Sequence, residues 1–98
     1  MGATESVEVQ APHRWRPEVL AFADAMEAKL KENDRKRHWY RLGMQTLSMR
    51  LTQEREELRR AVKSGDPAEV LREAADVANF AMMIADMVRR HPKTANTP

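Results

Sequence analysis

Hydrophobic residues recur at helical spacing in three separate stretches of this 98-residue chain. Intervals of three and four residues place side chains on one face of a helix, whereas a strand requires alternation. The first stretch begins at Pro17, which suits the first turn of a helix, and fades over residues 31–34. Its apolar stripe consists of Val19, Phe22, Ala23, Met26 and Leu30. The pattern predicts a first helix here, after a polar segment at residues 1–14 that we expect to be disordered or loosely ordered.

The second predicted helix runs from about residue 42 to residue 63. Its seam is formed by Met44, Leu47, Leu51, Leu58 and Ala61. The intervals of the seam require one more apolar residue at position 54, where the chain has Glu54 instead. Gly65 suits the position just after this helix, because glycine adopts the left-handed conformation at little cost.

The third predicted helix runs from Pro67 to about residue 90, before Pro92. Asp66, Pro67 and Glu69 match the N-cap, N1 and N3 positions of a capping box. Since only a short turn separates the second and third helices, we expect them to pack as an antiparallel hairpin.

The third helix is apolar around most of its circumference. Its main stripe is Val70, Ala74, Val77, Ala81, Ile84 and Val88, and its clearly polar strip is only Arg72, Asn79, Asp86 and Arg90. A helix of this kind needs cover on more than one side, which three helices in one chain can hardly supply. The sequence therefore predicts an all-α domain at residues 15–91, with a flexible tail at residues 92–98. We expect oligomerisation to complete a four-helix-bundle core, as a homodimer or homotetramer.

Composition removes several classes of function. There is no cysteine, which excludes disulfides, thiolate metal sites and a cysteine nucleophile. The net charge of +2 is too small to indicate nucleic-acid binding. The N-terminus has no apolar signal core, and the apolar stretch at residues 74–88 is short and interrupted by polar residues, so we expect a cytoplasmic protein and no membrane span.

Four acidic residues form two pairs at a spacing of three: Glu54 with Glu57, and Glu73 with Asp76. A hairpin centred on residues 65 and 66 would bring the two pairs opposite each other. Carboxylates in an apolar seam are costly unless they are paired or bind a cation, and all-oxygen ligation suits Mg²⁺ or Mn²⁺. The alternative is ordinary charged helices, with Arg50 paired to Glu54; otherwise Arg50 could neutralise phosphate.

These residues resemble the signature of the MazG-like nucleotide pyrophosphohydrolases, in the all-α NTP pyrophosphatase superfamily. The family pattern is EExxE followed by ExxD, and here it reads QEREE at residues 53–57 and EAAD at residues 73–76. The similarity extends over about residues 18–88. It implies that a nucleoside triphosphate is the substrate, cleaved to monophosphate and pyrophosphate. It also implies that Glu54, Glu57, Glu73 and Asp76 are the Mg²⁺ ligands and act in catalysis through the metal and its bound water.

The resemblance also suggests substrate contacts and one departure. Lys36 could meet phosphate, Trp39 could stack on a base, and Asn79 could reach substrate; the alternatives are a solvated charge, a core aromatic and a polar-strip residue, respectively. Gln53 replaces the first glutamate of EExxE, and an amide cannot act as a base. Two other functions stay open: a catalytically weak or inactive nucleotide-binding relative, and a helical oligomerisation or adaptor module.

Overall fold

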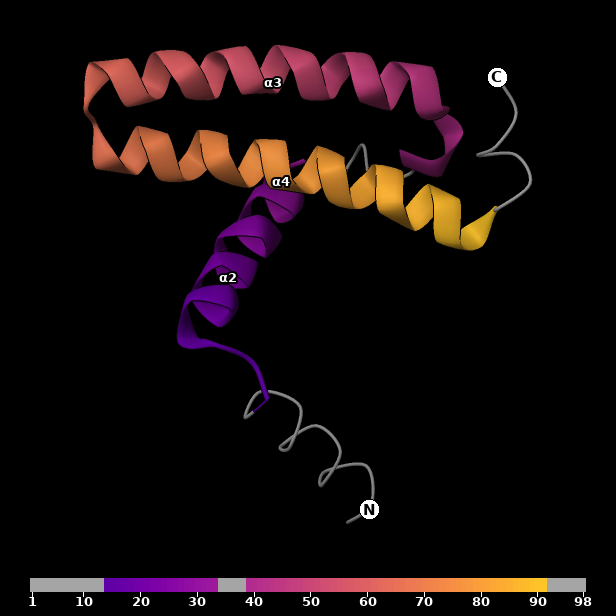
Figure 1. Cartoon of the computed structure of the whole chain (residues 1–98), viewed down its shortest axis with the longest axis horizontal. Helices are drawn as coiled ribbons and strands as arrows, with labels where there is room; N and C mark the ends of the chain where they lie inside the picture. The colour runs from indigo at the N-terminus through magenta and orange to yellow at the C-terminus, as the bar shows by residue number, and fades with distance from the viewer. Residues whose placement is uncertain (1–13, 34–38, 92–98) are drawn as a thin grey trace.

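The computed structural model describes residues 14–33 and 39–91, and regular structure in these ranges is entirely helical. These residues form three α-helices: α2 (Pro17–Glu32), α3 (Met44–Ser64) and α4 (Pro67–Arg90). A short 3₁₀ helix, η2 (Trp39–Arg41), lies between α2 and α3 in the chain. Figure 1 shows α3 and α4 lying side by side as a long hairpin, with α2 crossing α4. The predicted all-α class and the hairpin with an N-terminal helix are confirmed.

The turn between α3 and α4 forms at the residues that the sequence marks for it. Gly65 has a φ of 78°, and its N–H donates to the carbonyls of Ala61 and Val62. The Asp66 carboxylate then caps α4 by accepting from the N–H of Ala68 at 3.1 Å. The reciprocal half of the expected capping box differs, because the N–H of Asp66 lies 3.4 Å from the hydroxyl of Ser64.

The start of α3 lies two residues later than the predicted start at residue 42. Gly43 has a φ of 82° and a ψ of 157°, a conformation that essentially only glycine adopts. The chain therefore turns sharply before Met44, and the N–H of Leu42 donates to the carbonyl of Trp39 in the preceding 3₁₀ helix. Leu42 does not belong to the hydrophobic seam and is exposed, in agreement with a helix that begins after it.

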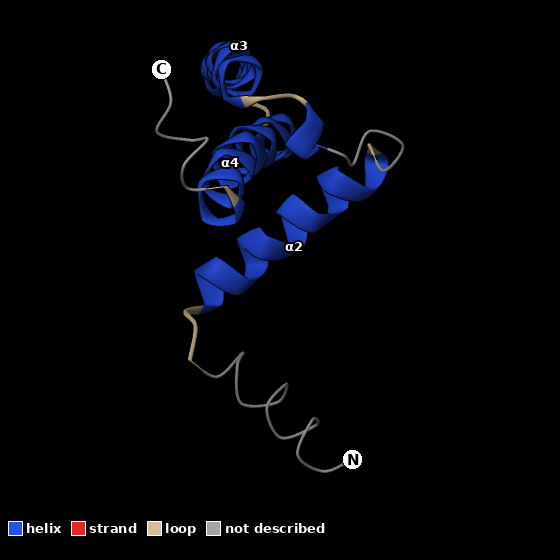
Figure 2. Cartoon of the chain, turned by 90° about the vertical axis from the view of Figure 1, so that its right-hand side faces the viewer, coloured by secondary structure: helices blue, strands red, loops and turns tan. Residues whose placement is uncertain are grey.

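α4 lies between its two neighbours, with α3 on one side and α2 on the other (Figure 2). Three residues of the polar strip of α4, spaced by seven, bind the N-terminal part of the chain. Arg72 Nη1 lies 3.1 Å from Glu32 Oε2, Asn79 Nδ2 donates to the carbonyl of Met26 at 3.0 Å, and Trp39 Nε1 donates to Asp86 Oδ2 at 3.2 Å. These polar residues therefore form much of the interface between α4 and the described segment before α3.

This arrangement corrects the expected apolar stripe of α4. Ala81 and Val88 were placed in the stripe, but both are exposed. The buried positions of α4 are instead Ala75, Asn79, Asp86 and Met87. They include Asn79 and Asp86 of the polar strip because α2 and η2 cover these two residues, which hydrophobicity alone could not indicate.

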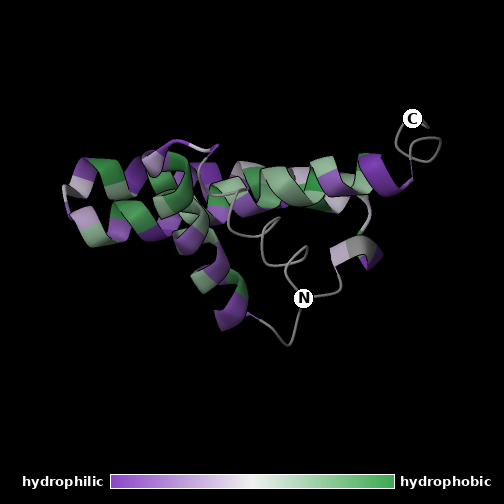
Figure 3. Cartoon of the chain, turned by 90° about the horizontal axis from the view of Figure 1, so that it is seen from below, coloured by the Kyte–Doolittle hydropathy of each residue, from purple (hydrophilic) through white to green (hydrophobic). Residues whose placement is uncertain are grey.

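The core of the described residues is small. Only four hydrophobic side chains there are buried: Leu47, Ala61, Ala75 and Met87. Eight large hydrophobic side chains are exposed: Trp15, Val19, Leu20, Leu42, Met49, Val62, Leu71 and Val88. Figure 3 shows apolar and hydrophilic residues alternating along all three helices, as expected for amphipathic helices. None of the described helices combines the length and apolarity needed to cross a membrane.

Candidate metal centre

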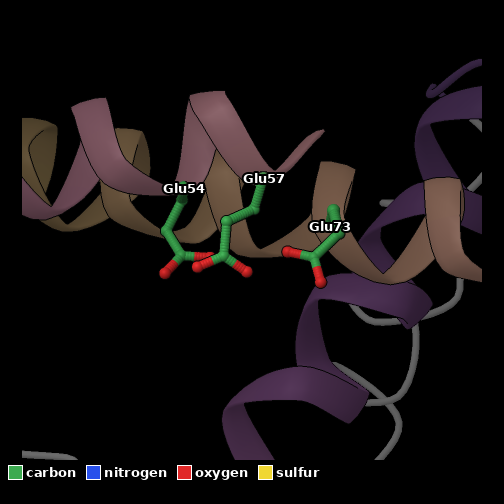
Figure 4. A group of neighbouring side chains, drawn as sticks. All are labelled: Glu54, Glu57 and Glu73. Atoms are coloured by element: carbon green, nitrogen blue, oxygen red, sulfur yellow. The ribbon is translucent and has the colours of Figure 1, made fainter. Parts of the chain in front are cut away.

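Three carboxylates converge where α3 faces α4. Glu54, Glu57 and Glu73 each offer one carboxylate oxygen, and these three oxygens lie within 4.8 Å of one another. Figure 4 shows Glu54 and Glu57 side by side on α3, with Glu73 pointing toward them from α4. The antiparallel turn thus brings the glutamate of the second pair opposite both members of the first. Clusters of exposed acidic groups are common without an ion, so the surroundings of each residue decide how the group is interpreted.

Glu54 occupies the seam position that an apolar residue would otherwise fill, and it is partly buried. Burial raises the pKa of Glu54, and the negative charges of Asp76 and Glu57 raise it further. The positive charges of Arg50 and Lys29 act in the opposite direction. The negative charge of ionised Glu54 is therefore only partly balanced by nearby positive charges, and a bound cation would stabilise it.

Glu73 is the most perturbed of the three glutamates. Its pKa is raised to about 7, chiefly by burial, with further contributions from a hydrogen bond with Glu69 and from the charges of Asp76, Glu57 and Glu54. Its Oε1 atom is buried without a hydrogen-bond partner among the described residues. A buried oxygen that lacks a partner is rare in folded proteins and is consistent with a ligand position.

Asp76, the fourth predicted ligand, lies outside this group of three. Its Oδ2 is 3.5 Å from Lys29 Nζ, and Lys29 Nζ is also 3.3 Å from Glu32 Oε1. Burial raises the pKa of Asp76, whereas the charge and hydrogen bond of Lys29 lower it. Asp76 is thus beside the cluster and electrostatically coupled to it, but its nearest counter-charge is a lysine from α2.

The remaining predicted site residues are distributed differently. The guanidinium of Arg50 lies 5.6 Å from the centre of the Phe80 ring, close enough for a cation–π contact. Asn79 is buried against α2, its Nδ2 is bound to a carbonyl, and its Oδ1 has no partner among the described residues. Trp39 donates its indole N–H to Asp86. Lys36 lies outside the described residues, and Gln53 is exposed.

The sequence patterns did not identify Lys29 as a residue near the acidic cluster, or Asp86 as a residue that binds another segment. Lys29 follows Met26 by three residues and Phe22 by seven, so a polar residue interrupts the apolar stripe of the first helix. Asp86 follows Asn79 by seven residues in the polar strip, and it accepts hydrogen bonds from Trp39, Arg89 and Arg90. A charge at a position that should face a neighbouring helix is the signal in both cases.

The donor set fits a hard divalent cation. Every donor in the group is a carboxylate oxygen, which is the ligand type that Mg²⁺ and Mn²⁺ prefer. The buried Oε1 of Glu73 supplies an oxygen that needs a partner.

Comparisons of the chain with protein-family models, with curated proteins and with solved structures find no match. The similarity of the two acidic motifs to MazG-like proteins therefore stays a prediction from the residues themselves.

Proposed function

We propose that Glu54, Glu57 and Glu73 hold a divalent cation, Mg²⁺ or Mn²⁺, and that the protein is a nucleoside triphosphate pyrophosphohydrolase. It would convert a ribo- or deoxyribonucleoside triphosphate to the monophosphate and pyrophosphate. The observation that supports this best is the convergence of three carboxylate oxygens within 4.8 Å. One of the three residues, Glu73, has a buried oxygen that finds no hydrogen-bond partner within residues 14–33 and 39–91. The resemblance of the motifs suggests the reaction, and the convergence of the carboxylates supports a cation site.

When bound, the cation would polarise phosphoryl oxygens, lower the pKa of an attacking water and offset charge on the leaving pyrophosphate. The three glutamates hold the site from two helices, so the hairpin fixes their separation. Asp76, three residues after Glu73 on α4, is the fourth ligand that the motif implies, and its carboxylate is paired with Lys29. The chain needs no protein nucleophile in this scheme, in agreement with the absence of cysteine.

Three predicted substrate contacts, Arg50, Asn79 and Trp39, have different surroundings in the structure. Arg50 is exposed, and its charge reaches Glu54, so it is positioned to neutralise a phosphate that binds at the cluster. The side-chain amide of Asn79 and the indole N–H of Trp39 are bound within the chain, so both residues position α2 and η2 against α4. A stacking role for Trp39 would use the face of its ring rather than its N–H.

The test is a panel of nucleoside triphosphates assayed for pyrophosphate release with Mg²⁺ and with Mn²⁺. We expect turnover of at least one nucleotide, and a loss of about 100-fold or more in Glu57→Gln or Glu73→Gln, since even residues that only support metal ligands matter by 10–100-fold. Glu56→Gln is the matched control, because Glu56 lies between the two ligands on α3 but is ion-paired with Arg59. Lack of turnover throughout the panel, by a folded protein, would remove the proposed activity.

One observation favours a weak or inactive nucleotide-binding relative. Gln53 stands where the family pattern has a glutamate, and it is exposed on α3 next to Glu54. Such a protein would show a higher Tm with nucleotide and Mg²⁺ but no pyrophosphate release. Activity gained by Gln53→Glu would identify this case.

Another observation favours a helical oligomerisation module. The described residues expose twice as many large hydrophobic side chains as the number of hydrophobic residues that they bury. A module without a metal site would show no stabilisation by Mg²⁺ or Mn²⁺. It would also tolerate the combined change of Glu54→Gln and Glu57→Gln, which the enzyme would not.

A further inference from the structure

Lys29 is the least exposed basic group in any ion pair of the described residues. Its side chain is 12% exposed, whereas the paired arginines at positions 59, 72, 89 and 90 are between 51% and 79% exposed. A lysine is seldom shielded from water to this degree unless its charge is compensated. Its two partners, Glu32 and Asp76, provide that compensation from two different helices.

The position of Lys29 relative to the acidic cluster is specific. Its Nζ is 3.5 Å from Asp76 Oδ2, on the α4 helix that also carries Glu73. Its positive charge also reaches Glu54, where it opposes the effects of burial and of the neighbouring carboxylates. Lys29 therefore provides a positive charge beside four carboxylates that would otherwise repel one another.

Lys29 has a second carboxylate partner on its own helix. Its Nζ is also 3.3 Å from Glu32 Oε1, one turn along α2. Glu32 is fixed in turn by the Arg72 guanidinium, with contacts of 3.1 and 3.4 Å. If Asp76 were taken by another cation, the ammonium would keep a carboxylate partner without unfolding α2.

We propose that Lys29 is a built-in counter-ion that competes with the divalent cation for Asp76. The inference rests on the proposed function, because it assumes that the cluster binds a cation. Without the cation, Lys29 stabilises the fold and keeps Asp76 outside the group of three glutamates. With the cation, Lys29 withdraws to Glu32, and Asp76 joins Glu54, Glu57 and Glu73 as the fourth ligand.

Competition predicts two effects of opposite sign from one substitution. Lys29→Met keeps the length of the side chain but removes its charge. In metal-free buffer its Tm should fall by roughly 4 °C or more, as for a loss of about 1 kcal/mol in a chain of this size. Its affinity for Mn²⁺ should instead rise by about tenfold, because a competing positive charge next to a ligand is gone. A purely structural lysine would give the first effect without the second.

The experiment measures Mn²⁺ binding by titration calorimetry and Tm with EDTA or with Mn²⁺, on the full chain. Lys31→Met is the matched control, since it removes the same charge from an exposed position of the same helix, and it should change neither quantity substantially. Lys29→Arg keeps the charge and should keep the metal-free Tm. In an Asp76→Asn background, Lys29→Met should no longer tighten Mn²⁺ binding, because the contested ligand is absent.

The outcomes separate this inference from the proposed function. If the wild type binds Mn²⁺ and Lys29→Met binds it no more tightly, competition is overturned and the metal site stands. If neither protein binds Mn²⁺, both proposals fail. If Lys29→Met does not fold even with saturating Mn²⁺, and Lys29→Gln behaves the same way, then Lys29 is needed for packing alone and the inference is overturned.

Discussion

At the scale of single residues, four carboxylates of the same chemistry have three different environments. Glu57 is exposed, Glu54 and Glu73 are partly buried in the hairpin, and Asp76 is partly buried against Lys29. Burial raises the pKa of Glu54, Glu73 and Asp76, and Glu73 is shifted furthest, to about 7. The proton on Glu73 thus relieves the same repulsion that a metal would relieve.

This shift predicts how stability depends on pH in metal-free buffer. The pKa of Glu73 is about 7 in the folded protein and 4.5 as an ordinary glutamate, so the folded state binds the proton more tightly. The contribution of Glu73 to stability is therefore fully present below pH 4.5 and is lost as the pH rises to about 7. We expect the Tm of the wild type to decrease over this interval more than that of Glu73→Gln, which cannot titrate.

The comparison needs a control for the other acidic groups. Glu27→Gln removes an exposed glutamate from α2 and should leave the pH dependence of the wild type unchanged. Thermal unfolding with EDTA at half-unit steps of pH measures all three proteins. Curves that run parallel for the wild type and Glu73→Gln would show that Glu73 titrates as an ordinary surface glutamate.

The grouping of three glutamates could be predicted from the sequence, because it follows from helical spacing and a single tight turn. Glu54 is visible as an interruption of the seam of α3, and Gly65 with Asp66 fixes the register of α4 against it. The contact between Lys29 and Asp76 could not be predicted in the same way, since it depends on the crossing of α2 over α4. The crossing is set by contacts between residues about 40 to 50 positions apart in the sequence, for which no local pattern exists.

At the scale of helices, α2 is joined to α4 by several polar contacts. α2 contains no buried residue, and its N-terminal apolar residues Val19 and Leu20 are exposed. Two ties between α2 and α4 are shielded from water: the hydrogen bond from Asn79 to the carbonyl of Met26, and the ion pair of Lys29 with Asp76. The pair of Arg72 and Glu32 is exposed. The helices themselves follow from periodicity, whereas these ties join residues that are far apart in the sequence.

This difference predicts unequal effects within one interface. Asn79→Ala removes the part-buried hydrogen bond to the carbonyl of Met26, and a bond of this kind contributes about 0.5–1.5 kcal/mol. Arg72→Ala should change little, since exposed ion pairs contribute weakly. We expect amide hydrogen exchange within α2 to accelerate in Asn79→Ala, with a smaller change in Arg72→Ala. A role of Asn79 in substrate binding alone would instead raise the KM of the proposed nucleotide hydrolysis and leave exchange in α2 unaltered.

At the scale of the whole molecule, the described chain leaves too much apolar surface without cover. Four buried hydrophobic residues form its core, whereas Leu42, Met49, Val62, Leu71 and Val88 lie exposed along the hairpin and just before it. A domain of this size buries a limited fraction of its surface and depends on every apolar contact. Apolar surface spread along a two-helix hairpin is the kind that a second hairpin covers in a four-helix bundle.

We therefore expect the protein to be at least a dimer in solution. Light scattering coupled to size-exclusion chromatography would give the mass, and a dimer should have twice the 11.3 kDa of the chain. Because association stabilises the folded state by mass action, the Tm should also rise with protein concentration. Leu71→Lys places a charge on an exposed apolar position of α4 and should lower both the mass and the Tm if that position is covered in the assembly. A monomeric mass at every concentration, together with a constant Tm, would contradict the expected four-helix bundle and leave the three helices as the complete fold.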